Sequence, residues 1–245
     1  MAVGDASLVK FGIGQSVPRT EDPYLLRGQG RYTDDINRPG QAYAAFVRSR
    51  YAHGRLRGID TATARAMPGV LGVYTAADLK EYGTLKCMLP TTNRDGTPML
   101  QPAWHALASD RVLYVGDAVA FVVAKTPVEA KDAAEAVEVD IEPLPAVIDP
   151  ERAVKPGAPQ LYDDVPQNLA ADYHFGDTAK VKEAFARAAH VTRLEITNNR
   201  VVVSTMEPRG AIGEYEPSTG KWTLRTGCQG VFGLRNQLAR DVLKA

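Results

Sequence analysis

One glycine-rich run could bind a ligand. It is Gly227-Cys228-Gln229-Gly230-Val231-Phe232-Gly233, and we expect it to join a strand to a helix. Free amides at the start of a helix attract anions, and glycines let a ligand approach the backbone closely. The residues alone leave other interpretations open: a plain turn whose glycines only permit positive φ, or a flavin or nucleotide site. The pairs Gly12-Ile13-Gly14 and Gly28-Gln29-Gly30 lack the rest of a dinucleotide fingerprint and are interpreted as turns.

Residue types that bind metals or act as nucleophiles do not cluster in the sequence. The four histidines are too far apart for a helical metal pair, so we interpret them as structural or surface residues. The two cysteines, Cys87 and Cys228, form neither a disulfide framework nor a zinc motif, and we expect Cys228 to be a small buried residue. The dipeptides Asp34-Asp35 and Asp163-Asp164 stand beside turn residues, which favours exposed turn aspartates over a catalytic carboxylate pair.

Composition excludes several classes of protein. The 245 residues include 29 Lys+Arg and 29 Asp+Glu, so no net charge attracts nucleic acid or an anionic membrane. Apolar residues make up 44% of the chain, yet no stretch approaches the roughly 18 apolar residues of a membrane span. The first residues lack the apolar core of a secretory signal. The sequence therefore predicts a folded cytoplasmic protein with reduced thiols and no nucleic-acid partner.

The first half of the chain predicts strands around one capped helix. Thr126-Pro127-Val128-Glu129 is typical of a helix start, since Thr126 can cap the amide of Glu129, and Glu129 can reach back. Small residues at 130, 133 and 134, followed by Val137, form an apolar stripe that can pack closely on a sheet. The other elements expected here are strands at 42–47, 70–74, 118–124 and 137–142, and a short helix at 60–66 capped by Asp60 or Thr61.

A proline-rich stretch separates this half from a second unit. Six prolines between 143 and 167 disfavour helix and interior strand, so we expect a surface connection between domains. Asp177 can cap a helix with an apolar stripe at Val181, Ala184, Phe185 and Ala188. Beyond it we expect strands at 194–196 and 201–203, a hairpin with a five-residue loop at 216–220, and a helix starting with Leu234, Leu238 and Val242.

Several short blocks follow one another in an order that is specific as a set. They include Arg19-x-Glu21-Asp22-Pro23, Tyr32-x-Asp34-Asp35, Phe46-Val47-Arg48-Ser49, Met67-Pro68-Gly69-Val70, Tyr114-Val115-Gly116-Asp117 and Met206-Glu207-Pro208-Arg209-Gly210. Together they resemble the large subunit of the molybdenum hydroxylases, the family of xanthine dehydrogenase, aldehyde oxidase and carbon monoxide dehydrogenase. Two positions depart from the usual pattern: Arg50, where a proline is common, and Cys228, where Thr or Ser often precedes the glutamine.

The resemblance implies a cofactor and one functional side chain. Gln229 would point its amide at an oxo ligand of a molybdopterin-type molybdenum cofactor, because such an oxygen accepts hydrogen bonds but cannot donate them. Gly230 would line the same site, whereas Glu207 and Arg209 would support a nearby turn. The family's general base would lie beyond Ala245, so no catalytic residue and no direct metal ligand is expected here. Iron–sulfur clusters and FAD would sit on partner subunits or domains, since no cysteine framework for them exists in this sequence.

The resemblance also implies a fold and an activity. We expect an α+β chain with an extended arm at 1–19, a hammerhead domain at 20–145, a connection at 146–167 and the start of a cofactor-binding domain at 168–245. The complete subunit, in a homodimer of heteromers, would hydroxylate an aldehyde or N-heterocycle carbon with water. Carbon monoxide is mildly disfavoured by the Asn93–Pro98 insertion. The alternative is a non-catalytic assembly or binding module from a split or truncated gene.

Overall fold

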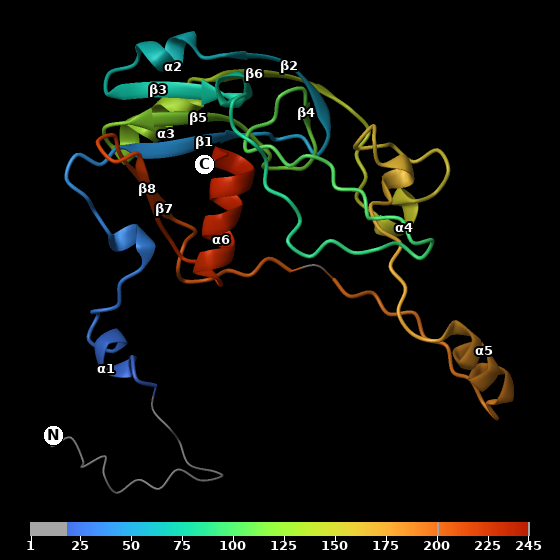
Figure 1. Ribbon diagram of the computed structural model, residues 1–245. Coiled ribbons are helices and arrows are strands. Elements are labelled where there is room, and N and C mark those ends of the chain that lie inside the picture. The colour runs from blue at the N-terminus through green and yellow to red at the C-terminus, as the bar shows by residue number, and fades with distance from the viewer. Residues whose placement is uncertain (1–18, 200, 245) are drawn as a thin grey trace, which may run out of the picture. The chain divides into compact units, whose positions relative to one another are not determined.

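The computed structural model describes residues 19–199 and 201–244, and it combines helices with antiparallel strands (Figure 1). The predicted α+β class is therefore confirmed. The chain divides into two compact units, one holding residues 19–38 and 201–227 and the other holding 39–199 and 228–244. Nearly all of the arm predicted at 1–19 lies outside the described residues. Among the described helices, none is long and apolar enough to cross a membrane.

The larger unit contains a three-stranded antiparallel sheet in the order β1-β5-β3. Its central strand is the apolar run predicted from the sequence, and five of its seven residues are buried. A strand paired on both edges has no free backbone donors or acceptors, which suits a strand that also packs on both faces. The three strands are β1 (Tyr43–Arg48), β3 (Val70–Thr75) and β5 (Ala118–Ala124).

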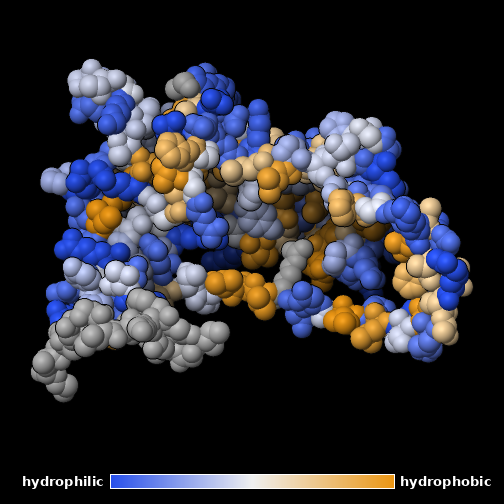
Figure 2. All heavy atoms as spheres, turned by 60° about the horizontal axis from the view of Figure 1, so that its bottom comes forward, coloured by the Kyte–Doolittle hydropathy of each residue, from blue (hydrophilic) through white to orange (hydrophobic). Residues whose placement is uncertain are grey.

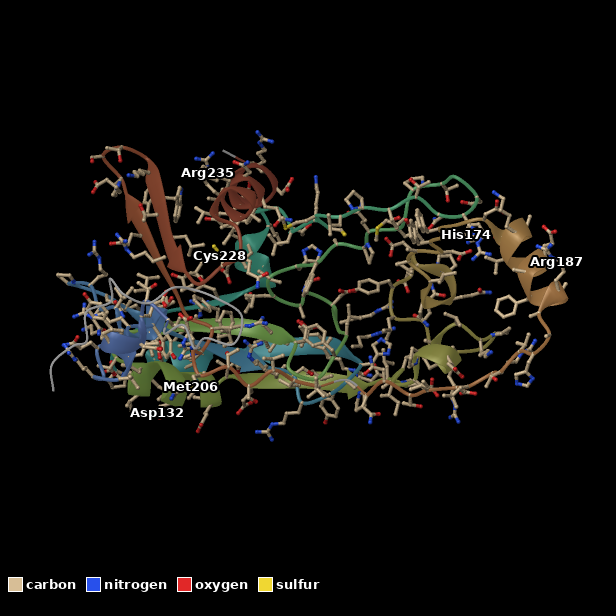
Figure 3. All side chains as sticks on the ribbon, turned by 90° about the horizontal axis from the view of Figure 1, so that it is seen from below. Asp132, His174, Arg187, Met206, Cys228 and Arg235 are labelled. Carbon is tan, nitrogen blue, oxygen red and sulfur yellow. The ribbon has the colours of Figure 1, made fainter. Side chains whose placement is uncertain are left out.

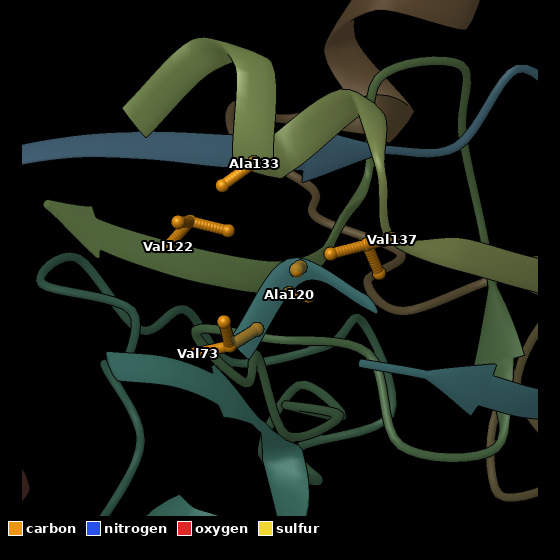
Figure 4. Close-up of a cluster of buried hydrophobic side chains, with 6 residues drawn as sticks. Val73, Ala120, Val122, Ala133 and Val137 are labelled. Carbon is orange, nitrogen blue, oxygen red and sulfur yellow. The ribbon is translucent and has the colours of Figure 1, made fainter. Parts of the chain in front are cut away.

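Helix α3 (Pro127–Glu135) packs against this sheet, and its predicted cap is confirmed. The Thr126 hydroxyl accepts a hydrogen bond from the Glu129 amide at 3.2 Å and donates one to the Glu129 carboxylate at 2.9 Å. Glu129 thus reaches back to the hydroxyl of Thr126. Because Ala130 and Ala133 have small side chains, the helix lies close to the strands. The first core cluster, partly labelled in Figure 4, consists of Ala64, Val73, Ala120, Val122, Ala133 and Val137.

A second three-stranded sheet has the order β4-β2-β6. The sequence predicted its strand β6 but not its central strand β2, whose arginines and glycines hide the alternation of buried and exposed positions. A second core cluster of Ala108, Val112 and Val119 packs against side chains of this sheet. The strands are β2 (Gly54–Asp60), β4 (Arg111–Val112) and β6 (Glu138–Pro143).

Two short helical segments flank strand β3. Helix α2 (Ala62–Ala66) precedes it, and its N-cap residue, Thr61, makes no side-chain cap. The Asp60 carboxylate accepts a hydrogen bond from the Ala62 amide at 2.8 Å. The 3-10 helix η3 (Ala76–Leu79) follows it. There the Asp78 carboxylate accepts a hydrogen bond from the Thr75 backbone amide at 2.7 Å. This hydrogen bond lowers the pKa of Asp78 below its ordinary value.

The proline-rich stretch is more structured than the sequence predicted. Asp149 caps a short helix, α4 (Pro150–Ala153), in which Pro150 occupies a first-turn position that needs no amide donor. A 3-10 turn, η4 (Pro166–Asn168), follows the buried Val165. The Asp177 cap and helix α5 (Thr178–Arg187) are confirmed, but the apolar stripe of α5 stays exposed, with Phe185 61% accessible.

The strands predicted at 194–196 and 201–203 are absent from the described structure, so that prediction is wrong for this chain. Neither segment has a pairing partner among the described residues, and an isolated strand does not satisfy its own backbone groups. Their side chains remain open to solvent, with accessibilities of 80% for Leu194, 76% for Ile196 and 92% for Val202. Apolar side chains are accordingly visible at the surface in the space-filling view (Figure 2).

The smaller unit is built on the predicted hairpin of β7 (Ala211–Glu216) and β8 (Lys221–Thr226). Glu216 pairs with Lys221, so the loop has four residues, 217–220, and not the predicted five. Tyr215 and Trp222 face each other across the strands with ring centroids 4.5 Å apart. The same unit includes helix α1 (Asp22–Leu25) and the 3-10 helix η2 (Thr33–Asp35), where Asp34 and Asp35 are exposed as predicted.

Candidate cofactor site

Gln229 lies between strand β8 and helix α6 (Val231–Gln237), as the sequence predicted for its strand-to-helix junction. Its side chain is exposed, and no hydrogen bond in the described part of the chain uses its amide. Gly230 is the residue before the helix, and no side chain caps the amides of the first turn. The junction therefore presents a side-chain donor together with uncapped backbone donors.

Gly230 leaves open space beside Gln229. A β-carbon built on Gly230 would meet no heavy atom within 4 Å. Its φ of 171° is extended backbone that any residue adopts, so the backbone conformation does not require glycine here. The space beside Gly230 is therefore unoccupied by other described residues.

Glu207 fills a structural role in the smaller unit. Its carboxylate accepts hydrogen bonds from the Thr33 amide at 3.3 Å and the Thr33 hydroxyl at 3.4 Å. A β-carbon built on Gly227 would lie 3.7 Å from the same carboxylate oxygen, so Glu207 also borders the end of the hairpin. These contacts agree with the interpretation of Glu207 as a support for a turn. Arg209 is exposed, and no contact in the described residues assigns it a function.

The expectation for Cys228 is wrong, because this cysteine is exposed. It lies in the junction between β8 and α6 and is labelled in Figure 3. Cys87 is exposed as well, and both thiols are free. No base within the described hydrogen-bond network contacts Cys228, so the geometry assigns it no nucleophilic role.

One of the four histidines, His53, is buried, and the other three are exposed. His53 is buried, and its Nδ1 donates to the Pro145 carbonyl oxygen at 2.8 Å, which fixes the ring beside the end of β6. His174 and His190 are exposed and pair with nearby threonine hydroxyls. In the part of the chain that the structure describes, no three His, Cys, Asp or Glu side chains gather in a way that could hold a metal ion.

Two family models match the chain in succession. Residues 27–145 match the a/b hammerhead domain of aldehyde oxidase and xanthine dehydrogenase, and residues 161–245 match the molybdopterin cofactor-binding domain. The chain belongs to the molybdenum hydroxylase family. Gln229 and Gly230 fall within the part that matches the cofactor-binding domain.

Individual relatives agree with this assignment. The chain is 41% identical over 206 residues to the nicotine 6-hydroxylase large subunit of Paenarthrobacter nicotinovorans, covering 83% of this chain and 24% of that protein. It is 37% identical to the carbon monoxide dehydrogenase large chain of Afipia carboxidovorans, covering 87% and 27%. The crystal structure of quinoline 2-oxidoreductase from Pseudomonas putida 86 matches with a TM-score of 0.80 and 34% identity, covering 94% and 28%. The chain thus spans about a quarter of the length of these relatives.

The residues at the junction fit a molybdopterin-type cofactor. A terminal oxo group only accepts hydrogen bonds, and Gln229 offers an exposed amide donor without a partner in the described residues. The open space at Gly230 and the uncapped first turn of α6 add room and backbone donors for an electron-rich group. Gln229 and Gly230 are consecutive in the sequence, and both are exposed at the junction.

Proposed function

We propose that this chain supplies the hammerhead domain, at 20–145, and the first section of the cofactor-binding domain, at 168–245, of a molybdenum-dependent hydroxylase subunit. The bound cofactor would supply hydroxylation of a carbon atom with oxygen from water. The observation that carries the proposal is the exposed, unpartnered amide of Gln229 at a strand-to-helix junction within the cofactor-domain match. In this proposal, Gln229 donates a hydrogen bond to an oxo ligand of the molybdenum, and Gly230 leaves the approach open.

We propose an aldehyde or an N-heterocycle as the substrate. Two of the relatives, the nicotine 6-hydroxylase large subunit and quinoline 2-oxidoreductase, support the heterocycle, because nicotine and quinoline are both N-heterocyclic. The carbon monoxide dehydrogenases are also similar to this chain, so sequence likeness alone does not separate the substrate classes. Our preference for an aldehyde or heterocycle over carbon monoxide rests on the insertion at residues 93–98. This insertion forms a turn in which the Asn93 backbone amide donates a hydrogen bond to the Thr97 carbonyl oxygen at 2.7 Å.

The proposal includes partners for electron transfer. Relatives are named as a large subunit, a large chain and subunit gamma of a complex, which supports a heteromeric assembly. We propose that iron–sulfur and FAD-binding subunits or domains carry the electrons away, that two heteromers pair, and that the complex works in the cytoplasm. The remainder of the molybdenum subunit would provide the general base.

The decisive experiment expresses the gene with whatever coding sequence follows Ala245, together with neighbouring genes for iron–sulfur and flavin proteins. Purified complex is assayed for molybdenum by elemental analysis and for dye-linked oxidation of nicotine, quinoline, benzaldehyde and carbon monoxide. Molybdenum with turnover of a heterocycle or aldehyde supports the proposal. A stable complex without molybdenum and without turnover would favour the non-catalytic module. Flavin absorbance of the 245-residue chain purified without its partners would favour the flavin enzyme.

A further inference from the structure

The helix that follows Gln229 is held against a segment of the hammerhead part of the chain, residues 81–88. Helix α6 continues into a π-helix, η5 (Leu238–Leu243), and both belong to the larger unit together with that segment. The contacts run along the helix. The side-chain amide of Gln237 donates a hydrogen bond to the Lys86 carbonyl oxygen at 2.6 Å. The Lys244 ammonium donates one to the Glu81 carbonyl oxygen at 2.9 Å.

Gly83 makes the closest approach in this contact. Its amide donates to the carbonyl oxygen of Val242 at 2.8 Å, so the two backbones touch directly. A β-carbon built on Gly83 would overlap the carbonyl oxygen of Asp241, a backbone atom that cannot rotate away. Gly83 is not among the glycines with positive φ, so its own backbone conformation would accept alanine. Only the nearness of the helix excludes a side chain at this position.

The other end of the helix is tied to the same segment and to Gln229. The Met88 side chain lies against Gly233, where a β-carbon would come within 3.2 Å of its methyl group. The Leu234 amide donates to the Gly230 carbonyl oxygen at 3.2 Å, so Gly230 is bound into the first turn. Helix α6 and η5 are continuous from Val231 to Leu243. We therefore expect a displacement of this helix at Gly83 to reach Gly230 and the preceding Gln229.

We propose that Gly83 is a positioning residue that sets the placement of Gln229 by allowing helix α6 and η5 to dock on residues 81–88. In Figure 3 this segment, in teal after β3, lies beside α6. The inference rests on the proposed function only in its second half, the placement of Gln229 toward a cofactor. Its first half, the dependence of the helix on Gly83, concerns this chain alone.

The first experiment measures amide hydrogen exchange by mass spectrometry on the 245-residue chain. Gly83→Ala should accelerate exchange across 231–243 about tenfold or more, while α3 and β5 keep the exchange rates of the unsubstituted chain. Gly58→Ala is the matched control, because a β-carbon at Gly58 meets nothing within 4 Å and its φ is not positive. Unchanged exchange in 231–243 for Gly83→Ala would overturn the proposal.

A second variant, Gln237→Ala, tests the same contact if the Gly83→Ala chain does not fold. Gln237→Ala removes only the hydrogen bond to the Lys86 carbonyl and adds no bulk, so it should accelerate exchange across 231–243 about threefold with the core unchanged. Faster exchange in α3 and β5 as well would show that the contact supports the whole unit and does not specifically hold the helix, which would also overturn the proposal.

The second experiment uses the complete complex and compares single and double variants. Gly83→Ala should lower turnover per bound molybdenum about tenfold, whereas in a Gln229→Ala background it should lower turnover no further, because the two residues act through one another. Losses that multiply would leave Gly83 with a structural role only. If the unsubstituted complex contains no molybdenum and turns over no substrate, the proposed function fails, while the exchange result on the 245-residue chain still decides the docking of the helix.

Discussion

The carboxylate of Glu207 accepts hydrogen bonds from the amide and the hydroxyl of Thr33, although the two residues are 174 positions apart in the sequence. The Met206–Gly210 block and the segment around Thr33 are thereby joined within the smaller unit. Thr33 and Glu207 are both half-buried, so a lost acceptor is only partly replaced by water.

Glu207→Ala should therefore lower the free energy of unfolding by about 1 kcal/mol. Glu207→Gln keeps one acceptor oxygen and should lower it less. A denaturant titration followed by Trp222 fluorescence, within the same unit, measures both. Glu195→Ala is the control, since Glu195 is exposed and has no partner in the described residues. Equal losses for Glu207→Ala and Glu195→Ala would exclude a stabilising contact with Thr33.

Thr126→Ala should destabilise the larger unit by about 0.5–2 kcal/mol, the usual range for loss of an N-cap side chain. The hydroxyl caps the Glu129 amide at the start of α3, and α3 covers the core. Thr178→Ala is the matched control. The Thr178 hydroxyl contacts only the exposed His174 ring, and the cap of α5 comes from Asp177. A urea titration giving the same midpoint shift for both variants would show that the Thr126 cap contributes nothing specific.

Acid should weaken the hairpin of the smaller unit through Glu214. Hydrogen bonds from Arg38 and then Arg225, each at 3.1 Å, hold the pKa of Glu214 below its ordinary value of 4.5. A carboxylate whose pKa is lower in the folded state stabilises the fold above its unfolded pKa, and this contribution is lost as the pH falls through the folded pKa. Glu214→Gln should flatten the stability profile below pH 4.5 and leave it parallel to the unsubstituted chain above that pH. Thermal unfolding followed by circular dichroism at pH values below and above 4.5 measures both profiles. If Glu214→Gln leaves the loss of stability in acid unchanged, Glu214 does not cause that loss.

The isolated 245-residue chain should retain no stoichiometric molybdenum and oxidise neither aldehydes nor purines. It spans about a quarter of the length of its relatives, and the proposal places the general base outside it. Elemental analysis and a dye-linked assay on the purified chain provide the measurement. Stoichiometric molybdenum together with turnover would contradict the prediction.

In the complete enzyme, Gln229→Ala should slow turnover per molybdenum about 10- to 100-fold, since an unpaired polar contact costs about 1–3 kcal/mol. Gln229→Glu should be slower still, because it places an acceptor against an oxygen that is itself an acceptor. Molybdenum content should fall less than activity. Gln101→Ala, at another exposed glutamine, is the control. Turnover like that of the unsubstituted enzyme for both Gln229 variants would remove the residue from the site.

The sequence by itself determined the helices and strands that are stabilised by contacts between residues close together in the chain. The Thr126 and Asp177 caps, the β7–β8 hairpin and the buried run of β5 all follow from residues a few positions apart, and each is present in the structure. The junction containing Gln229 and Gly230 belongs to this group, because a strand followed by glycines and an apolar helical spacing is a local pattern. The order of the family blocks likewise carried the assignment that the family models confirm.

Tertiary structure decided what depends on distant partners. Strand β2 forms because β4 and β6 pair with it on both sides, despite its arginines and glycines. Residues 201–203 are all valine, a strand-forming type, but they have no pairing partner in the described part of the chain and form no strand. The exposure of Cys228 could not be predicted from its residue type, since burial depends on which segments pack around a residue after folding. The overlap that a side chain on Gly83 would make with Asp241 is invisible in the sequence, because only folding brings those two backbones together.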